Sequence, residues 1–124
     1  MKNIIKEKSF LFALIIIKLY RYLTEQKKEY VMSKQVLRSG TAIGALVRES
    51  EYAESKADFI HKLAIALKEA NETEYWLELL HQSSYINSKS FQSIATDLTE
   101  LLKLLIAIVK KSKENKMIKN INNE

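Results

Sequence analysis

The chain has 124 residues, of which 47% are hydrophobic and 28% charged, with two glycines, no proline and a net charge of +5. This length and apolar content are typical of one compact domain, while the scarcity of turn-forming residues argues against a β-sandwich or a barrel. The absence of cysteine excludes disulfides, thiolate zinc sites and thiol nucleophiles.

The first predicted helix has apolar residues spaced by sevens, fours and threes, as one face of a helix requires. These residues are Ile5, Phe12, Ile16, Leu19 and Leu23. A polar stretch follows, so we place a turn near residues 27–31. The most apolar run, residues 10–17, is shorter than the ~20 residues that span a bilayer. Lys18 and Arg21 follow it directly, which argues against a cleaved signal peptide, and we expect a cytoplasmic protein with no membrane partner.

The second predicted helix resumes this spacing at Met32, Val36, Ile43 and Val47. Gly40 and Gly44 lie four residues apart among small residues, so one face of this helix is nearly free of side chains. We expect another helix to pack closely there.

Residues 55–58 have the pattern of a capping box, in which a serine oxygen accepts a hydrogen bond from a backbone amide. This pattern predicts the start of a third helix. Its apolar stripe runs to about His81 through Phe59, Leu63, Ala66, Ala70, Thr73, Leu77 and Leu80. Residues 82–90 are rich in Ser and Asn, which favour turns. The stripe of the fourth helix is Phe91, Ile94, Leu98, Leu101, Leu105 and Ile108.

Four helices joined by short connections predict an all-α fold, an antiparallel up-and-down four-helix bundle. We expect residues 1–114 to form this bundle. Residues 115–124 are rich in Lys and Asn and poor in apolar residues, so we expect a frayed basic tail.

Charge is distributed unevenly along the chain. Residues 1–50 hold ten Lys or Arg against four Glu, residues 51–109 hold five against nine acids, and residues 110–124 hold five against two. The two ends of the chain are therefore basic and the middle is acidic. Such a protein is suited to bind nucleic acid or to self-associate.

Sequence motifs for catalysis are weak. Asp58 with His61, and Glu78 with His81, have the spacing of ligands in di-iron bundles, but both pairs lie on the third helix, whereas such a core needs ligands from several helices. The chain has neither a nucleophile elbow nor a phosphate-binding glycine loop. We expect no enzyme activity, no metal and no cofactor.

The third helix also carries polar residues beside its apolar stripe. Asn71 and Glu74 lie on that flank, so we expect them to be partly buried. A buried carboxylate needs a cation, and Arg38 or Arg48 on the second helix could provide it. We interpret such pairs as structural first, with a role in assembly or in ligand binding as the alternative.

Two blocks carry a family resemblance: Leu-Arg-Ser-Gly-Thr within residues 33–45, and Glu-Thr-Glu-Tyr-Trp-Leu at residues 72–77. With residues 55–59 and 65–70 between them, the series resembles the four-helix-bundle proteins encoded within 23S ribosomal RNA intervening sequences, once labelled S23 ribosomal proteins. The resemblance covers about residues 5–112.

This resemblance implies a bundle that assembles into a ring-like homopentamer. It also implies kinship with the accessory variability protein of diversity-generating retroelements, a basic pentamer that binds nucleic acid and a reverse transcriptase. The chain departs from the family pattern where an Asn-Ile-Ala-Glu run is common: Glu49 is kept, but Leu46 and Arg48 replace the amide and the small residue. Glu49 therefore joins the candidate assembly residues, and Arg48 adds positive charge.

Two functional hypotheses follow. The first is a non-enzymatic nucleic-acid-binding oligomer, whose cations would contact phosphates without reading sequence. The candidate residues are Lys18, Arg21, Lys27, Lys28, Lys34, Arg38, Arg48, Lys110, Lys111 and Lys113. The alternative is a protein-interaction scaffold that uses the acidic third helix with Tyr75, Trp76 and Tyr85.

Overall fold

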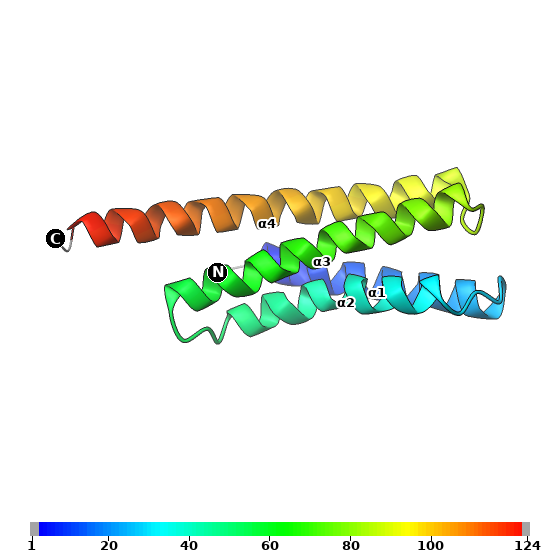
Figure 1. Ribbon diagram of the computed structural model, residues 1–124, viewed down its shortest axis with the longest axis horizontal. Helices are drawn as coiled ribbons and strands as arrows, with labels where there is room; N and C mark the ends of the chain where they lie inside the picture. Colours follow the sequence, from blue (N-terminus) through cyan, green and yellow to red (C-terminus); the bar gives the residue numbers. More distant parts are fainter. Residues whose placement is uncertain (1–2, 123–124) are drawn as a thin grey trace.

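The computed structural model describes residues 3–122, which form four helices that alternate in direction (Figure 1). Helix α1 spans Ile4–Glu25, α2 Met32–Ser50, α3 Lys56–Gln82 and α4 Ser88–Asn122. No strand occurs among these residues. Each helix packs against the next one along the chain, and α1 and α4 also touch, less extensively than the consecutive helices do. The predicted fold class, an antiparallel up-and-down bundle, is confirmed.

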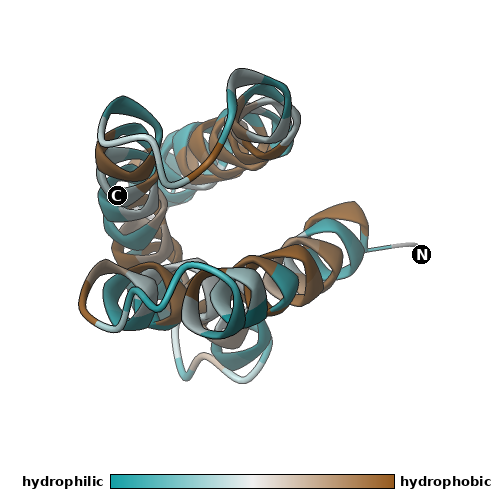
Figure 2. Ribbon diagram, turned by 90° about the vertical axis from the view of Figure 1, so that its right-hand side faces the viewer, coloured by the Kyte–Doolittle hydropathy of each residue, from teal (hydrophilic) through white to brown (hydrophobic). Residues whose placement is uncertain are grey.

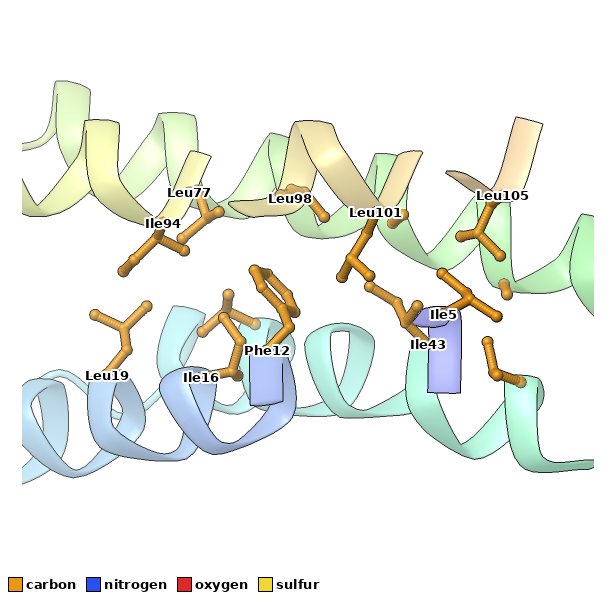
Figure 3. Close-up of a cluster of buried hydrophobic side chains, with 14 of the residues drawn as sticks. Ile5, Phe12, Ile16, Leu19, Ile43, Leu77, Ile94, Leu98, Leu101 and Leu105 are labelled. Atoms are coloured by element: carbon orange, nitrogen blue, oxygen red, sulfur yellow. The ribbon is translucent and has the colours of Figure 1, made fainter. Parts of the chain in front are cut away.

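Most of the core consists of the four apolar stripes expected from the sequence. Met32, Phe59, Phe91 and Ile108 of those stripes are only partly buried, and Ile60 and Ile86, from outside them, are buried. Phe12 and Leu101 are 1% exposed and Leu105 is fully buried, and their side chains point into the space between the helices (Figure 3). Figure 2 shows the same pattern for whole helices, whose hydrophobic sides face the interior. Burying a side chain of this size contributes about 1.5–3 kcal/mol, so the core is the main source of stability.

The expected close approach of helices occurs between α1 and α2. A Cβ atom added to Gly40 would lie 2.8 Å from Cγ1 of Ile16, and one added to Gly44 would lie 3.3 Å from the backbone oxygen of Ser9. The two glycines therefore bring the backbones of α1 and α2 together. Towards α3, the buried hydroxyl of Ser39 accepts a hydrogen bond from Thr73 at 2.9 Å.

The starts of α1, α3 and α4 are each fixed by the residue just before the helix, whose side chain accepts a backbone hydrogen bond. Ser55 Oγ accepts from the amide of Asp58 at 3.0 Å, which confirms the predicted start of α3. Asn3 caps α1 through the amide of Lys6, and Asn87 accepts from the amide of Ser90 in α4.

The segment expected to form a frayed tail is helical as far as the structure describes it. Helix α4 continues to Asn122 and projects beyond the other helices (Figure 1). No glycine or proline interrupts this stretch, and its Lys, Glu and Met residues favour helix. Lys113 and Met117 also line a shallow groove with Ile60 of α3, so part of the tail lies against the bundle. Residues 123–124 lie outside the described residues.

Candidate functional site

Five cations gather where α1 turns into α2. Lys18 and Arg21 lie on the last turns of α1, Lys27 and Lys28 in the turn and Lys34 on the first turn of α2, and all five are exposed. We call these five residues the basic end. Two acids occur in the same segment, the exposed Glu25 and the buried Glu29. Within residues 3–122 none of the five cations forms an ion pair, so their charge faces solvent.

Glu29 holds this turn in place. Its carboxylate accepts hydrogen bonds from the backbone amides of Val31 and Met32, both at 3.1 Å, and of Ser33 at 2.7 Å. The Ser33 hydroxyl in turn donates to the backbone oxygen of Glu29 at 2.8 Å. Burial raises the pKa of Glu29, but these hydrogen bonds outweigh it and hold that pKa below its ordinary value. The buried acid thus caps α2 and leaves Lys27 and Lys28 exposed beside it.

The remaining candidate lysines lie at the opposite end of the bundle. Lys110, Lys111 and Lys113 are exposed on the C-terminal half of α4. Lys89, at the start of α4, lines a groove with Lys18, and 24 residues of helix separate Lys89 from Lys113, or about 36 Å at 1.5 Å per residue. The structure therefore places the two basic segments on separate surfaces.

Arg38 belongs to an ion-pair network with α3. Its guanidinium donates to both carboxylate oxygens of Glu69, at 2.8 and 3.2 Å, and also to Glu72. Glu72 accepts a further hydrogen bond from the indole nitrogen of Trp76 at 3.0 Å. The hydrogen bonds from Trp76 and Arg38 lower the pKa of Glu72, and those to Glu69 and Glu72 raise the pKa of Arg38. Arg38 is thus neutralised by two acids.

The predicted pairing of Glu74 is therefore wrong. Glu74 and Asn71 are exposed rather than partly buried, because the flank of α3 that faces Arg38 carries Glu69 and Glu72 instead. Arg48 does not pair with these acids either: its guanidinium lies 5.3 Å from the ring centre of Phe10 on α1. Glu49 faces Lys62 of α3 at 3.5 Å.

A groove runs between α1 and α4 near the basic end, with a volume of about 590 Å³. We call it the α1–α4 groove. Its inner wall consists of Leu19, Ile86 and Ile94, which are buried, and of half-buried Ile15. Leu19 and Ile94 face each other across it (Figure 3). Its rim carries Lys18, Tyr22, Asn87, Lys89, Ser90 and Ser93, all of them exposed.

Helix α1 also has an apolar face directed away from the core. Ile4, Phe10, Leu11 and Leu14 lie on it and are between 44% and 57% exposed. Helix α1 thus has two apolar sides. One packs in the core of the bundle, and the other is exposed on the surface.

The aromatic residues considered for a protein interface lie in three different settings. Tyr75 is 55% exposed. Trp76 is half-buried and hydrogen-bonded to Glu72, and Tyr85 packs against the core. The structure thus displays Tyr75 alone of the three at the surface.

The two histidines lie in different surroundings. His81 stacks on the ring of Phe91 at 4.4 Å, with its Nε2 3.1 Å from Ser88 Oγ, and His61 is exposed. Among residues 3–122 no three His, Asp or Glu side chains are grouped to hold a metal ion.

Two features of this region escape sequence reasoning. Glu29 lies in a polar stretch that is typical of a turn, so nothing in its composition indicates a buried residue. The one feature of the sequence that indicates a cap is its position four residues before Ser33. The α1–α4 groove has no sequence signal, because it depends on how α1 and α4 diverge.

None of the helices described, within residues 3–122, has the length and apolar content to cross a membrane. The family model of the 23S rRNA-intervening sequence protein matches residues 1–107. The chain belongs to this family. It is also similar to a crystal structure of a protein of unknown function from the S23 ribosomal protein family of Bacteroides thetaiotaomicron. The two are 60% identical, with a TM-score of 0.85 over 86% of this chain and 98% of that one. A search of curated proteins returned no match.

Membership of the 23S rRNA-intervening sequence protein family agrees with the observed bundle. The family match and the likeness to the Bacteroides structure confirm the resemblance drawn from the residues 33–45 and 72–77. The family match and the Bacteroides structure identify a family and a fold, and neither assigns a biochemical activity.

Proposed function

We propose that this protein is a non-enzymatic nucleic-acid-binding protein that acts as a homo-oligomer. The basic end carries the proposal: five exposed cations in a segment of 17 residues, with one exposed acid among them. Clustered cations bind phosphates because they release condensed counterions, and this binding does not depend on sequence. Arg38 is excluded from this surface because Glu69 and Glu72 neutralise it.

RNA is the nucleic acid we favour. The family is described by its association with 23S rRNA intervening sequences. With such an RNA as the partner, the protein acts in the cytoplasm. The kinship with retroelement accessory proteins that the resemblance implies adds a reverse transcriptase as a second candidate partner.

The exposed apolar face of α1 supports self-association. An exposed apolar patch of this kind is typical of a protein interface, and Phe10 and Leu11, next to each other on α1, are about half exposed. We propose that this face contacts a second copy of the chain, in the ring-like pentamer that the family resemblance implies. A ring would repeat the basic end in every subunit and multiply the number of bound phosphates.

Charge reversal tests the proposal. Fluorescence anisotropy would measure the binding of a labelled RNA between 50 and 200 mM salt, for the wild type and for Lys27→Glu/Lys28→Glu. We expect the variant to bind more weakly and to have a shallower dependence on salt. The log–log slope should fall by about 0.7–0.9 for each phosphate that the variant no longer neutralises.

The matched control reverses two lysines at the other end of the bundle, Lys110→Glu/Lys111→Glu, with the same change in net charge. If both variants weaken binding equally, net charge rather than the basic end is responsible. If the wild type binds no nucleic acid at low salt, the proposal is wrong. If this chain instead bound another protein, with an affinity that did not change with salt, the protein-interaction scaffold would be favoured.

A further inference from the structure

The α1–α4 groove brings together an apolar wall and a rim that carries two cations. Its inner wall is apolar, with Leu19, Ile86 and Ile94 each less than 10% exposed. Lys18 stands on one side of the rim and Lys89 on the other, since they come from α1 and α4. A ligand that fits must therefore present a flat or apolar part to the wall and negative charge to the rim.

The size of the groove agrees with such a ligand. Its volume of about 590 Å³ lies within the roughly 300–1,000 Å³ of small-molecule sites. Tyr22, 42% exposed, lines it and offers a ring on which a base can stack. Stacking on aromatic side chains is how many proteins hold unpaired bases without reading their sequence.

The groove is also continuous with the basic end. Lys18 belongs to both, and Arg21 follows it by one turn of α1. Lys27, in the next turn of the chain, lies 6.0 Å from the ring centre of Tyr22. A strand whose base occupied the groove would find further cations for its neighbouring phosphates along this path.

We propose that the α1–α4 groove binds an unpaired base of a single-stranded nucleic acid, with Tyr22 stacked on the base and Lys18 and Lys89 on the flanking phosphates. This inference rests on the nucleic-acid binding proposed above and adds a preference for single strands. A duplex keeps its bases stacked and paired inside the helix, so it reaches the cations of the basic end but not the apolar wall.

The experiment compares one sequence in two forms, a labelled 20-nucleotide single-stranded RNA and the 20-base-pair duplex that contains it, by anisotropy at constant salt. Tyr22→Leu removes the ring and keeps an apolar side chain. Ser93→Trp fills the groove from its exposed rim. Tyr22→Phe keeps the ring, and Tyr75→Leu removes an exposed tyrosine from α3, outside the groove. Circular dichroism verifies that each variant is folded.

We expect the wild type to bind the single strand more tightly than the duplex. Tyr22→Leu and Ser93→Trp should weaken binding of the single strand about tenfold, which is about 1.4 kcal/mol, and change binding of the duplex less than twofold. Tyr22→Phe and Tyr75→Leu should bind as the wild type does.

Two results would overturn the inference. If the folded Tyr22→Leu and Ser93→Trp variants bind the single strand like the wild type, the groove holds no base, while nucleic-acid binding at the basic end stands. If the wild type binds neither form, the proposed function and the groove fail together.

Discussion

Substitution of Glu29 gives the sharpest stability prediction, because its carboxylate accepts hydrogen bonds from three backbone amides at the start of α2. Glu29→Gln keeps the length of the side chain but replaces one oxygen by an NH2 group, which must face N–H donors. Loss of a helix cap costs about 0.5–2 kcal/mol, and a hydrogen bond to a charged group contributes about 1.5–3 kcal/mol. We therefore expect the free energy of unfolding to fall by about 2 kcal/mol at pH 7.

The pH dependence follows from the lowered pKa of Glu29 in the folded protein. A carboxylate whose folded pKa is below its unfolded value contributes stability above the unfolded pKa, about 4.3 for Glu. This contribution is lost as the pH falls through the folded pKa. The difference between the wild type and Glu29→Gln should therefore be largest at neutral pH and shrink steadily below about pH 4.3.

Urea unfolding followed by circular dichroism, at several pH values and one protein concentration, measures this difference. The concentration is held constant because self-association contributes to apparent stability. Glu25→Gln is the matched control, an exposed acid four residues away with no hydrogen bond among the described residues to lose, and should change stability by less than about 0.5 kcal/mol. A difference for Glu29→Gln that stays the same from pH 7 to pH 3 would refute the capping role of its charge.

Three further perturbations test other parts of the fold. Gly40→Ala should lower the free energy of unfolding by about 1–2 kcal/mol in urea denaturation, because its Cβ would lie 2.8 Å from Ile16, and Gly44→Ala should cost less; equal effects would contradict the close crossing. A double-mutant cycle of Arg38→Ala and Glu72→Gln should give a coupling of about 0.5–1 kcal/mol, since the arginine is half exposed, and additive effects would contradict the network. Leu14→Asp should reduce the mass measured by light scattering toward the 14.4 kDa of one chain, while Tyr75→Asp leaves it unchanged; an unaltered mass for Leu14→Asp would exclude that face of α1 as the interface.

Much of the bundle could be predicted from local patterns. The stripe from Ile5 to Leu23 has the spacing of a helix face, and all five of its predicted core residues are buried. Ser55 and Asp58 indicate where α3 starts, because a cap depends on residues three positions apart. Gly40 and Gly44 predict a close helix crossing, although the sequence does not say which helix makes it.

The ion pairs could not be predicted from one helix at a time. Asn71 and Glu74 were assigned to the buried flank of α3, but Arg38 contacts Glu69 and Glu72, because the rotation of α3 against α2 decides which acids face the arginine. The tail was predicted to fray because it is poor in apolar residues, whereas uninterrupted helix formers carry α4 to Asn122.

The sequence by itself determined the four helices and the family, because spacing, caps and motifs act between residues close together in the chain. Only the tertiary structure decided that the basic residues divide between two ends, and that Lys18 and Lys89 line the same groove. These placements depend on how α1 and α4 are oriented relative to each other. The two helices are far apart in the sequence, and they have fewer contacts than any other pair of helices that touch. The packing of the helices therefore decides which charged and apolar side chains lie together on the surface.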